Sequence, residues 1–159
     1  MLAAVLPGDF KWVAKKSLMK VPVLGWHLKL SGHVGVDRGG DRRTAVDSIA
    51  KFVDVVKAGK PLLIFPEGTR SADGKLKRFK NGGFHAALRG DVPLVPVMID
   101  GTYSLMSREA ASMEESEIQT VRVRLGHPIY PADLPEGAER VKALNERAFQ
   151  AVRAMFDGP

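Results

Sequence analysis

Residues 61–71 read Pro61-Leu62-Leu63-Ile64-Phe65-Pro66-Glu67-Gly68-Thr69-Arg70-Ser71, so that a short apolar run passes directly into an acid, a glycine, a hydroxyl and a guanidinium. The apolar run predicts a buried strand, and the polar residues then stand where the chain leaves the sheet. Ligands of open α/β folds bind outside the carboxyl ends of such strands. The stretch therefore predicts a ligand site in an α/β fold.

The residue types in this stretch suit a phosphorylated substrate. Gly68 lets the backbone turn tightly and come close to a ligand, Thr69 offers a hydroxyl, and Arg70 presents a planar fork of donors that matches phosphate oxygens. Glu67 can orient that arginine or hold a substrate hydroxyl. A lone Glu-Gly pair is more often a solvated turn, but the complete string favours a binding site.

Strand and helix patterns alternate along the rest of the chain. Strands are predicted at residues 10–15, 33–37, 62–65, 94–99 and 121–125, and helices at residues 21–30, 41–59, 82–89 and 136–156. Strands separated by helices imply a largely parallel or mixed central sheet with helices on both faces. The length of 159 residues predicts a single domain.

Composition excludes several kinds of site. The chain has no cysteine, so disulfides, zinc-thiolate centres and an acyl-cysteine intermediate are excluded. The longest apolar run, residues 92–99, is too short to cross a bilayer and contains two prolines. Residues 1–6 lack the pattern of a signal peptide. Contact with a membrane would therefore be peripheral.

The formal net charge of +6 favours anionic partners, which include phospholipid surfaces, phosphorylated substrates, coenzyme A, acyl carrier protein and nucleic acid. Trp12, Trp26 and His27 do not interleave with the basic residues of the 66–80 segment, so they are expected to pack in the core rather than to stack on bases. A nucleic-acid-binding module would rest on charge alone, and nucleic acid is not among the expected partners.

Four stretches together resemble the signature blocks of one family. In chain order they are Trp12-Val13-Ala14-Lys15-Lys16, Gly32-His33-Val34-Gly35-Val36-Asp37-Arg38, Phe65-Pro66-Glu67-Gly68-Thr69-Arg70-Ser71 and Leu94-Val95-Pro96-Val97. Their order and spacing are similar to those of the glycerophospholipid acyltransferases, of the 1-acyl-sn-glycerol-3-phosphate (lysophosphatidate) acyltransferase type. The resemblance extends from about Asp9 to about Thr102.

The resemblance implies a glycerol-3-phosphate acyltransferase-like fold and acyl transfer from acyl-CoA or acyl carrier protein to the free hydroxyl of lysophosphatidate or a related lysophospholipid. It places Arg38 and Arg70 on the substrate phosphate, and Glu67, Gly68 and Thr69 at the glycerol end. Of the adjacent Lys15 and Lys16, one is expected to face the phosphate and the other water, and Lys15 is taken as the substrate-binding residue. It implies neither a metal nor a redox cofactor. It also implies a cytoplasmic protein that is peripheral at the cytoplasmic face of an anionic membrane.

One departure from the family pattern concerns catalysis. The family's catalytic block is a histidine and an aspartate separated by four residues, in which the histidine acts as general base. None of the four histidines has an aspartate five positions on, because those positions hold Gly32, Arg38, Gly90 and Ala132. The chain is therefore expected to be truncated at its N-terminus relative to the family, with no catalytic residue present. The alternative is a non-catalytic lipid- or phosphate-binding protein that keeps the pocket without the base.

Overall fold

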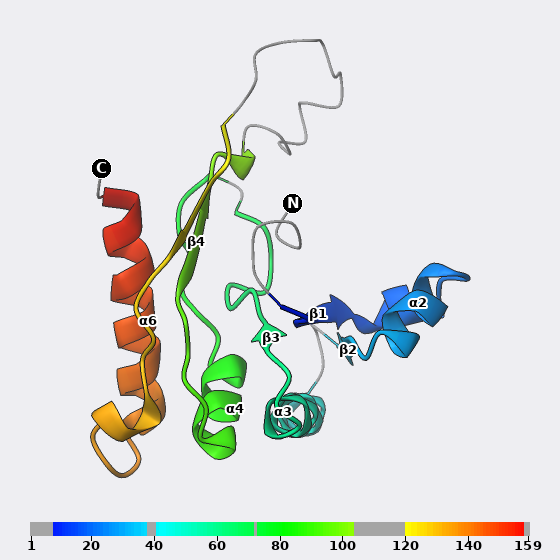
Figure 1. Ribbon diagram of the computed structural model, residues 1–159, viewed down its shortest axis with the longest axis horizontal. Helices are drawn as coiled ribbons and strands as arrows, with labels where there is room; N and C mark the ends of the chain where they lie inside the picture. The colour runs from blue at the N-terminus through cyan, green and yellow to red at the C-terminus, as the bar shows by residue number, and fades with distance from the viewer. Residues whose placement is uncertain (1–7, 38–40, 72, 104–119, 158–159) are drawn as a thin grey trace. The chain divides into compact units, whose positions relative to one another are not determined.

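The computed structural model describes residues 8–37, 41–71, 73–103 and 120–157 (Figure 1). The chain forms two compact units, of which the first is Met1–Gly68 with Lys80–Val92 and the second is Thr69–Phe79 with Pro93–Pro159. The expectation of a single domain stays a prediction. Within the described ranges, no helix is both long enough and apolar enough to cross a bilayer.

The first unit is built on a three-stranded parallel sheet. Its strands are β1 (Lys11–Lys15), β2 (Val34–Val36) and β3 (Leu62–Leu63), in the order β2-β1-β3. Val13 lies opposite Val34 and Lys11 lies opposite Leu62. Because all three strands run the same way, their carboxyl ends meet at one edge of the sheet.

Helices α3 (Arg42–Lys57) and α4 (Gly82–Gly90) pack on each other and complete the core of this unit. Asp41 caps α3, since its carboxylate accepts a hydrogen bond of 2.9 Å from the backbone N–H of Thr44. The core centres on one buried residue each from β2, α3 and α4, namely Val34, Phe52 and Ala86, with apolar residues of the three strand segments packed around them. Apolar residues from the strands and apolar residues from the helices thus pack in the same core.

Between β1 and β2 the chain forms a short 3₁₀ helix, η1 (Lys16–Lys20), and a helix, α2 (Leu24–Leu30). The two are joined by a tight turn in which Leu24 N–H donates a 2.7 Å hydrogen bond to the carbonyl of Pro22. The intervening Val23 has φ 63° and ψ −59°, the strained geometry of a γ-turn. Gly25 permits the close approach of α2 to η1, because a β-carbon there would collide with the carbonyl of Met19.

The second unit pairs a two-stranded antiparallel sheet with the long C-terminal helix. Strands β4 (Val97–Asp100) and β5 (Arg122–Leu125) are followed by η2 (Pro131–Asp133) and α6 (Arg140–Asp157). Helix α6 contacts β4 and buries one residue per turn, namely Leu144, Ala148 and Val152. Phe79 packs edge-on against Phe149 of α6, with ring centres 5.2 Å apart.

The predicted α/β class is confirmed, as are the nine predicted elements to within a few residues, whereas η1 and η2 were not predicted. The prediction for residues 21–30 was too early at its start, because the γ-turn delays α2 until Leu24. The prediction that Trp26 and His27 pack in the core was wrong: the Trp26 side chain is 68% exposed, and His27 is exposed as well. Trp12 is half-buried.

Candidate functional site

The carboxyl edge of the parallel sheet gathers three of the six residues predicted to bind substrate. Lys15 is the last residue of β1, while Glu67 and Gly68 follow β3 within five residues. Because β1 and β3 are parallel and directly paired, these residues leave the sheet at the same edge. This edge is where ligands bind in folds of this class.

The turn at Phe65–Gly68 is fixed by the backbone. Gly68 N–H donates a 3.1 Å hydrogen bond to the carbonyl of Phe65, and Gly68 has φ 73°, which favours glycine. Lys80 N–H donates a 2.9 Å hydrogen bond to the carbonyl of Pro66, so the two ends of the 66–80 loop are joined. The Lys80 side chain covers the position that a β-carbon of Gly68 would occupy. Glu67 in this turn is half-buried.

Thr69 and Arg70 belong to the second unit, and both are exposed. The ammonium of Lys77 donates a 3.2 Å hydrogen bond to the carbonyl of Arg70, which holds the backbone rather than the guanidinium. The next turn is fixed by Ser71 and Asp73: the Ser71 hydroxyl lies 2.9 Å from the Asp73 carboxylate, which accepts from the backbone of Lys75. These hydrogen bonds lower the pKa of Asp73. Arg38, the other expected phosphate ligand, lies outside the described residues.

An ion pair that sequence reasoning missed joins the ends of β1 and β2. Lys16 Nζ lies 3.0 Å from a carboxylate oxygen of Asp37, and both side chains are about half exposed. A polar hollow of about 100 Å³ lies beside the pair and is also lined by Thr44 and Ser48 of α3. The signal in the sequence was the charge that directly follows each strand. Lys16 is thus engaged, whereas no ion pair of Lys15 is found in the described part of the chain.

Aromatic and histidine contacts support the same strands from within the first unit. The rings of Trp12 and Phe65 stack with centres 6.5 Å apart and planes inclined by 21°. The backbone N–H of Trp12 donates a 3.1 Å hydrogen bond to Nδ1 of His33. Burial of His33 lowers its pKa, and the nearby charge of Lys11 lowers it further. His33 therefore serves as a neutral acceptor in the scaffold, and its Nδ1 is occupied.

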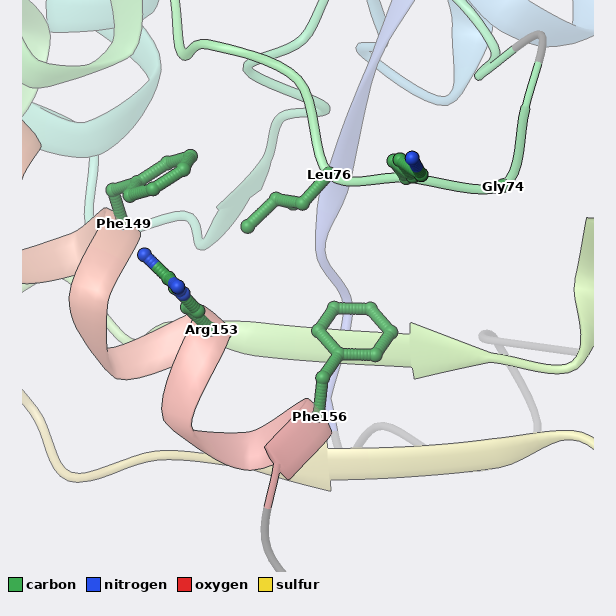
Figure 2. Close-up of a pocket in the computed structure, with 6 residues that line it drawn as sticks. Gly74, Leu76, Phe149, Arg153 and Phe156 are labelled. Carbon is green, nitrogen blue, oxygen red and sulfur yellow. The ribbon is translucent and has the colours of Figure 1, made fainter.

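The second unit contains a cavity of about 370 Å³ between the 74–76 segment and α6. Figure 2 shows Phe149, Arg153 and Phe156 along one face of α6, with Leu76 facing them. The lining combines apolar side chains with the cations Lys75 and Arg153. None of the five predicted binding residues that the structure describes lines it. Across the described residues, no group of three or more metal-ligating side chains gathers.

Comparison with protein families gives one match that covers most of the chain. Residues 1–100 match the model of the Acyltransferase family. This range contains the sequence positions of all six predicted binding residues and the strands β1, β2 and β3.

Individual relatives agree with the match to the Acyltransferase family. Proteins named 1-acyl-sn-glycerol-3-phosphate acyltransferase are similar to this chain in Chlamydomonas reinhardtii (39% identity, 76% of this chain, 35% of that protein) and in Saccharomyces cerevisiae (44% identity, 67% of this chain, 36% of that protein). The chain thus spans about a third of the length of these relatives. The crystal structure of the 1-acyl-sn-glycerophosphate acyltransferase PlsC from Thermotoga maritima matches with a TM-score of 0.70 at 25% identity, over 94% of this chain and 56% of that one.

Proposed function

The chain belongs to the Acyltransferase family, and we propose that it serves the transfer of an acyl group to the free hydroxyl of lysophosphatidate or a related lysophospholipid. In this reaction the hydroxyl oxygen attacks the carbonyl carbon of an acyl thioester. A carbon–oxygen bond forms, the carbon–sulfur bond breaks, and the hydroxyl proton leaves through a general base and ends on the thiol. The product is a diacyl phospholipid and a free thiol.

The observation that carries the proposal is the turn at Gly68. The turn stands at the carboxyl edge of a parallel sheet, is fixed by backbone hydrogen bonds and continues into a hydroxyl and a guanidinium. A preorganised turn of this kind lowers the entropic cost of holding a substrate. The relatives named as 1-acyl-sn-glycerol-3-phosphate acyltransferases suggest which substrate it holds.

Within this proposal the phosphate is bound by Arg38 and Arg70. Arginine suits this role because its planar fork can donate two hydrogen bonds to one phosphate. Lys15 adds a positive charge from the end of β1. Glu67, Gly68 and Thr69 shape the glycerol end of the site, with the Glu67 carboxylate able to accept from a substrate hydroxyl.

The proposed acyl donor is acyl-CoA or acyl carrier protein, and neither a metal nor a redox cofactor has a role. Both donors are anionic and suit a chain of net charge +6. The proposed place of action is the cytoplasmic face of an anionic membrane, where the protein is held peripherally. Lysophospholipids are available at such a surface.

A non-catalytic lipid- or phosphate-binding protein is the second candidate, because these 159 residues contain no His-x4-Asp pair. One experiment addresses both candidates. The chain is mixed with short-chain lysophosphatidate and acyl-CoA, with binding followed by titration calorimetry and free thiol followed by a colorimetric reagent. We expect lysophosphatidate binding with thiol release at background. Absence of binding would contradict the proposed substrate, and rapid thiol release would show that a base exists among the residues present.

A further inference from the structure

The segment from η1 to α2 exposes an unusual amount of apolar surface. Six of the thirteen large apolar side chains that are exposed in the described residues fall between positions 18 and 30. They range from 41% to 89% exposed and form what we call the η1–α2 surface, made of Leu18, Val21, Val23, Leu24, Trp26 and Leu30. Large apolar side chains that are exposed together in one short segment are characteristic of an interaction site.

The backbone holds these side chains outward. Gly25 is the one buried residue of α2, because it provides the close contact with η1. The γ-turn at Val23 sets the direction of α2 and leaves the Val23 side chain 73% exposed. Figure 1 shows α2 beyond the arrowhead of β1. The exposure therefore belongs to the folded geometry of this segment.

The charge of the same segment is of one sign. Residues 10–36 contain five lysines and no aspartate or glutamate. Two of the lysines are paired with acids outside this range, Lys11 with Asp9 and Lys16 with Asp37. Lys20 and Lys29, which flank the apolar side chains, are exposed and form no ion pair within the described residues. The η1–α2 surface is thus both apolar and cationic.

We propose that the η1–α2 surface docks on an anionic phospholipid bilayer. Tryptophan prefers the boundary between headgroups and acyl chains, and lysines beside it attract anionic lipids. Helix α2 has seven residues, a length of about 10 Å, so it can lie in the interface but cannot span the bilayer. The absence of acids from residues 10–36 is the charge complement of such a surface.

The position of the η1–α2 surface connects it to the candidate substrate site. Helix η1 begins at Lys16, directly after Lys15 at the carboxyl edge of the sheet. Docking through η1 and α2 places that edge beside the membrane, where a lysophospholipid can reach it from the lipid phase. This use of the surface rests on the proposed function, whereas docking itself does not. Vesicle binding without lysophosphatidate therefore tests the surface separately from the substrate site.

The first experiment uses Trp26 as a reporter. The chain has two tryptophans, so Trp12→Phe leaves Trp26 as the single one and keeps an aromatic ring against Phe65. On addition of phosphatidylglycerol-containing vesicles, the Trp26 emission should shift to shorter wavelength and be quenched by brominated acyl chains. An unchanged emission while the protein cosediments with the vesicles would overturn the proposal, because another surface would then be docking.

The second experiment compares matched variants by vesicle cosedimentation. Trp26→Ser with Leu30→Ser should weaken binding by about tenfold or more, since both remove apolar area from the interface. Lys20→Gln with Lys29→Gln should weaken binding to anionic vesicles about tenfold and reduce its dependence on salt. Tyr130→Ser, which changes a side chain 51% exposed in the second unit, is the control and should bind as the original chain does.

Circular dichroism establishes that each variant keeps its helix content. Equal binding by the Trp26→Ser/Leu30→Ser variant and the original chain would overturn the proposal. So would a lipid-free dimer, seen by sedimentation velocity, that the same substitutions dissociate without any change in vesicle binding. In that case the η1–α2 surface would be an interface between copies of the chain.

Discussion

Lys16 Nζ lies 3.0 Å from a carboxylate oxygen of Asp37, and this ion pair joins two parallel strands at the same edge, because Lys16 directly follows β1 and Asp37 directly follows β2. Both side chains are about half exposed, so the pair contributes about 0–1 kcal/mol to stability. The pair engages Lys16, whereas no ion pair of the adjacent Lys15 is found among the described residues.

This division of roles predicts that Lys15→Gln weakens lysophosphatidate binding by about threefold to tenfold, because an exposed charge–charge contact is lost. Lys60→Gln is the matched control, since Lys60 is also exposed but precedes β3 at the opposite edge of the sheet. Titration calorimetry measures both. Equal losses would mean that phosphate is attracted by the overall positive charge rather than by this edge.

Arg70→Ala should weaken lysophosphatidate binding by about 1.5–3 kcal/mol, as expected for loss of a charge-assisted contact to phosphate. Arg78→Ala, which removes another exposed arginine of the same loop, should cost about 0–1 kcal/mol. Lys77 is unsuitable as a control because its ammonium holds the Arg70 carbonyl. If Arg78→Ala costs as much as Arg70→Ala, the loop acts as a diffuse basic surface.

Gly68→Ala should lower the free energy of unfolding by about 1 kcal/mol, because alanine is strained at φ 73°. Gly59→Ala imposes the same strain at φ 71°, just beyond α3, with open space around the new methyl group. Chemical denaturation should therefore show a loss for both, larger in Gly68→Ala because the new methyl group also displaces the Lys80 side chain, whereas lysophosphatidate binding should fall in Gly68→Ala alone. Unaltered binding by Gly68→Ala would remove the turn from the site.

The lowered pKa of His33 predicts a dependence of stability on pH. The folded chain holds His33 neutral as the acceptor for Trp12 N–H, whereas in the unfolded chain it titrates near its ordinary value of 6.5. The unfolded state therefore binds more protons as the pH falls below 6.5, and the stability that His33 contributes above that pH is lost. Urea denaturation between pH 7.5 and 5 should show this decrease.

The decrease should be smaller in His33→Gln, whose amide oxygen can accept the same hydrogen bond without titrating. His127→Gln, at an exposed position in the second unit, is the control and should keep the original pH dependence. An identical decrease in all three proteins would assign the effect to other groups.

The sequence predicted those parts of the structure that depend on local patterns. The apolar run before Glu67 forms a strand, although β3 is half-buried rather than buried as predicted, and the expected helices form at Arg42–Lys57 and Arg140–Asp157. Trp26 was misplaced because a large aromatic residue normally gains free energy by burial, and nothing local shows that Gly25 fills the one buried position of α2. Partners distant in sequence, such as Lys16 with Asp37 and Trp12 with His33, depend on the pairing of β1 with β2, which no local pattern reveals.

For the candidate site, the sequence predicted the position of some residues in the fold. Lys15, Glu67 and Gly68 stand at one sheet edge, as strand ends in a parallel sheet must. Binding roles for all six predicted residues stay predictions, because they depend on contacts with a substrate rather than on the fold. The γ-turn at Val23 was missed because β-branched residues rarely adopt a positive φ.

The most direct test of the account compares two ligands that differ by one group. Short-chain lysophosphatidate and the monoacylglycerol with the same acyl chain are titrated into the original chain and into Arg70→Ala. We expect the original chain to bind lysophosphatidate about tenfold or more tightly than monoacylglycerol. Arg70→Ala should lose most of this preference, while its affinity for monoacylglycerol is unchanged. Equal affinity of the original chain for the two ligands, or an undiminished preference in Arg70→Ala, would contradict this expectation.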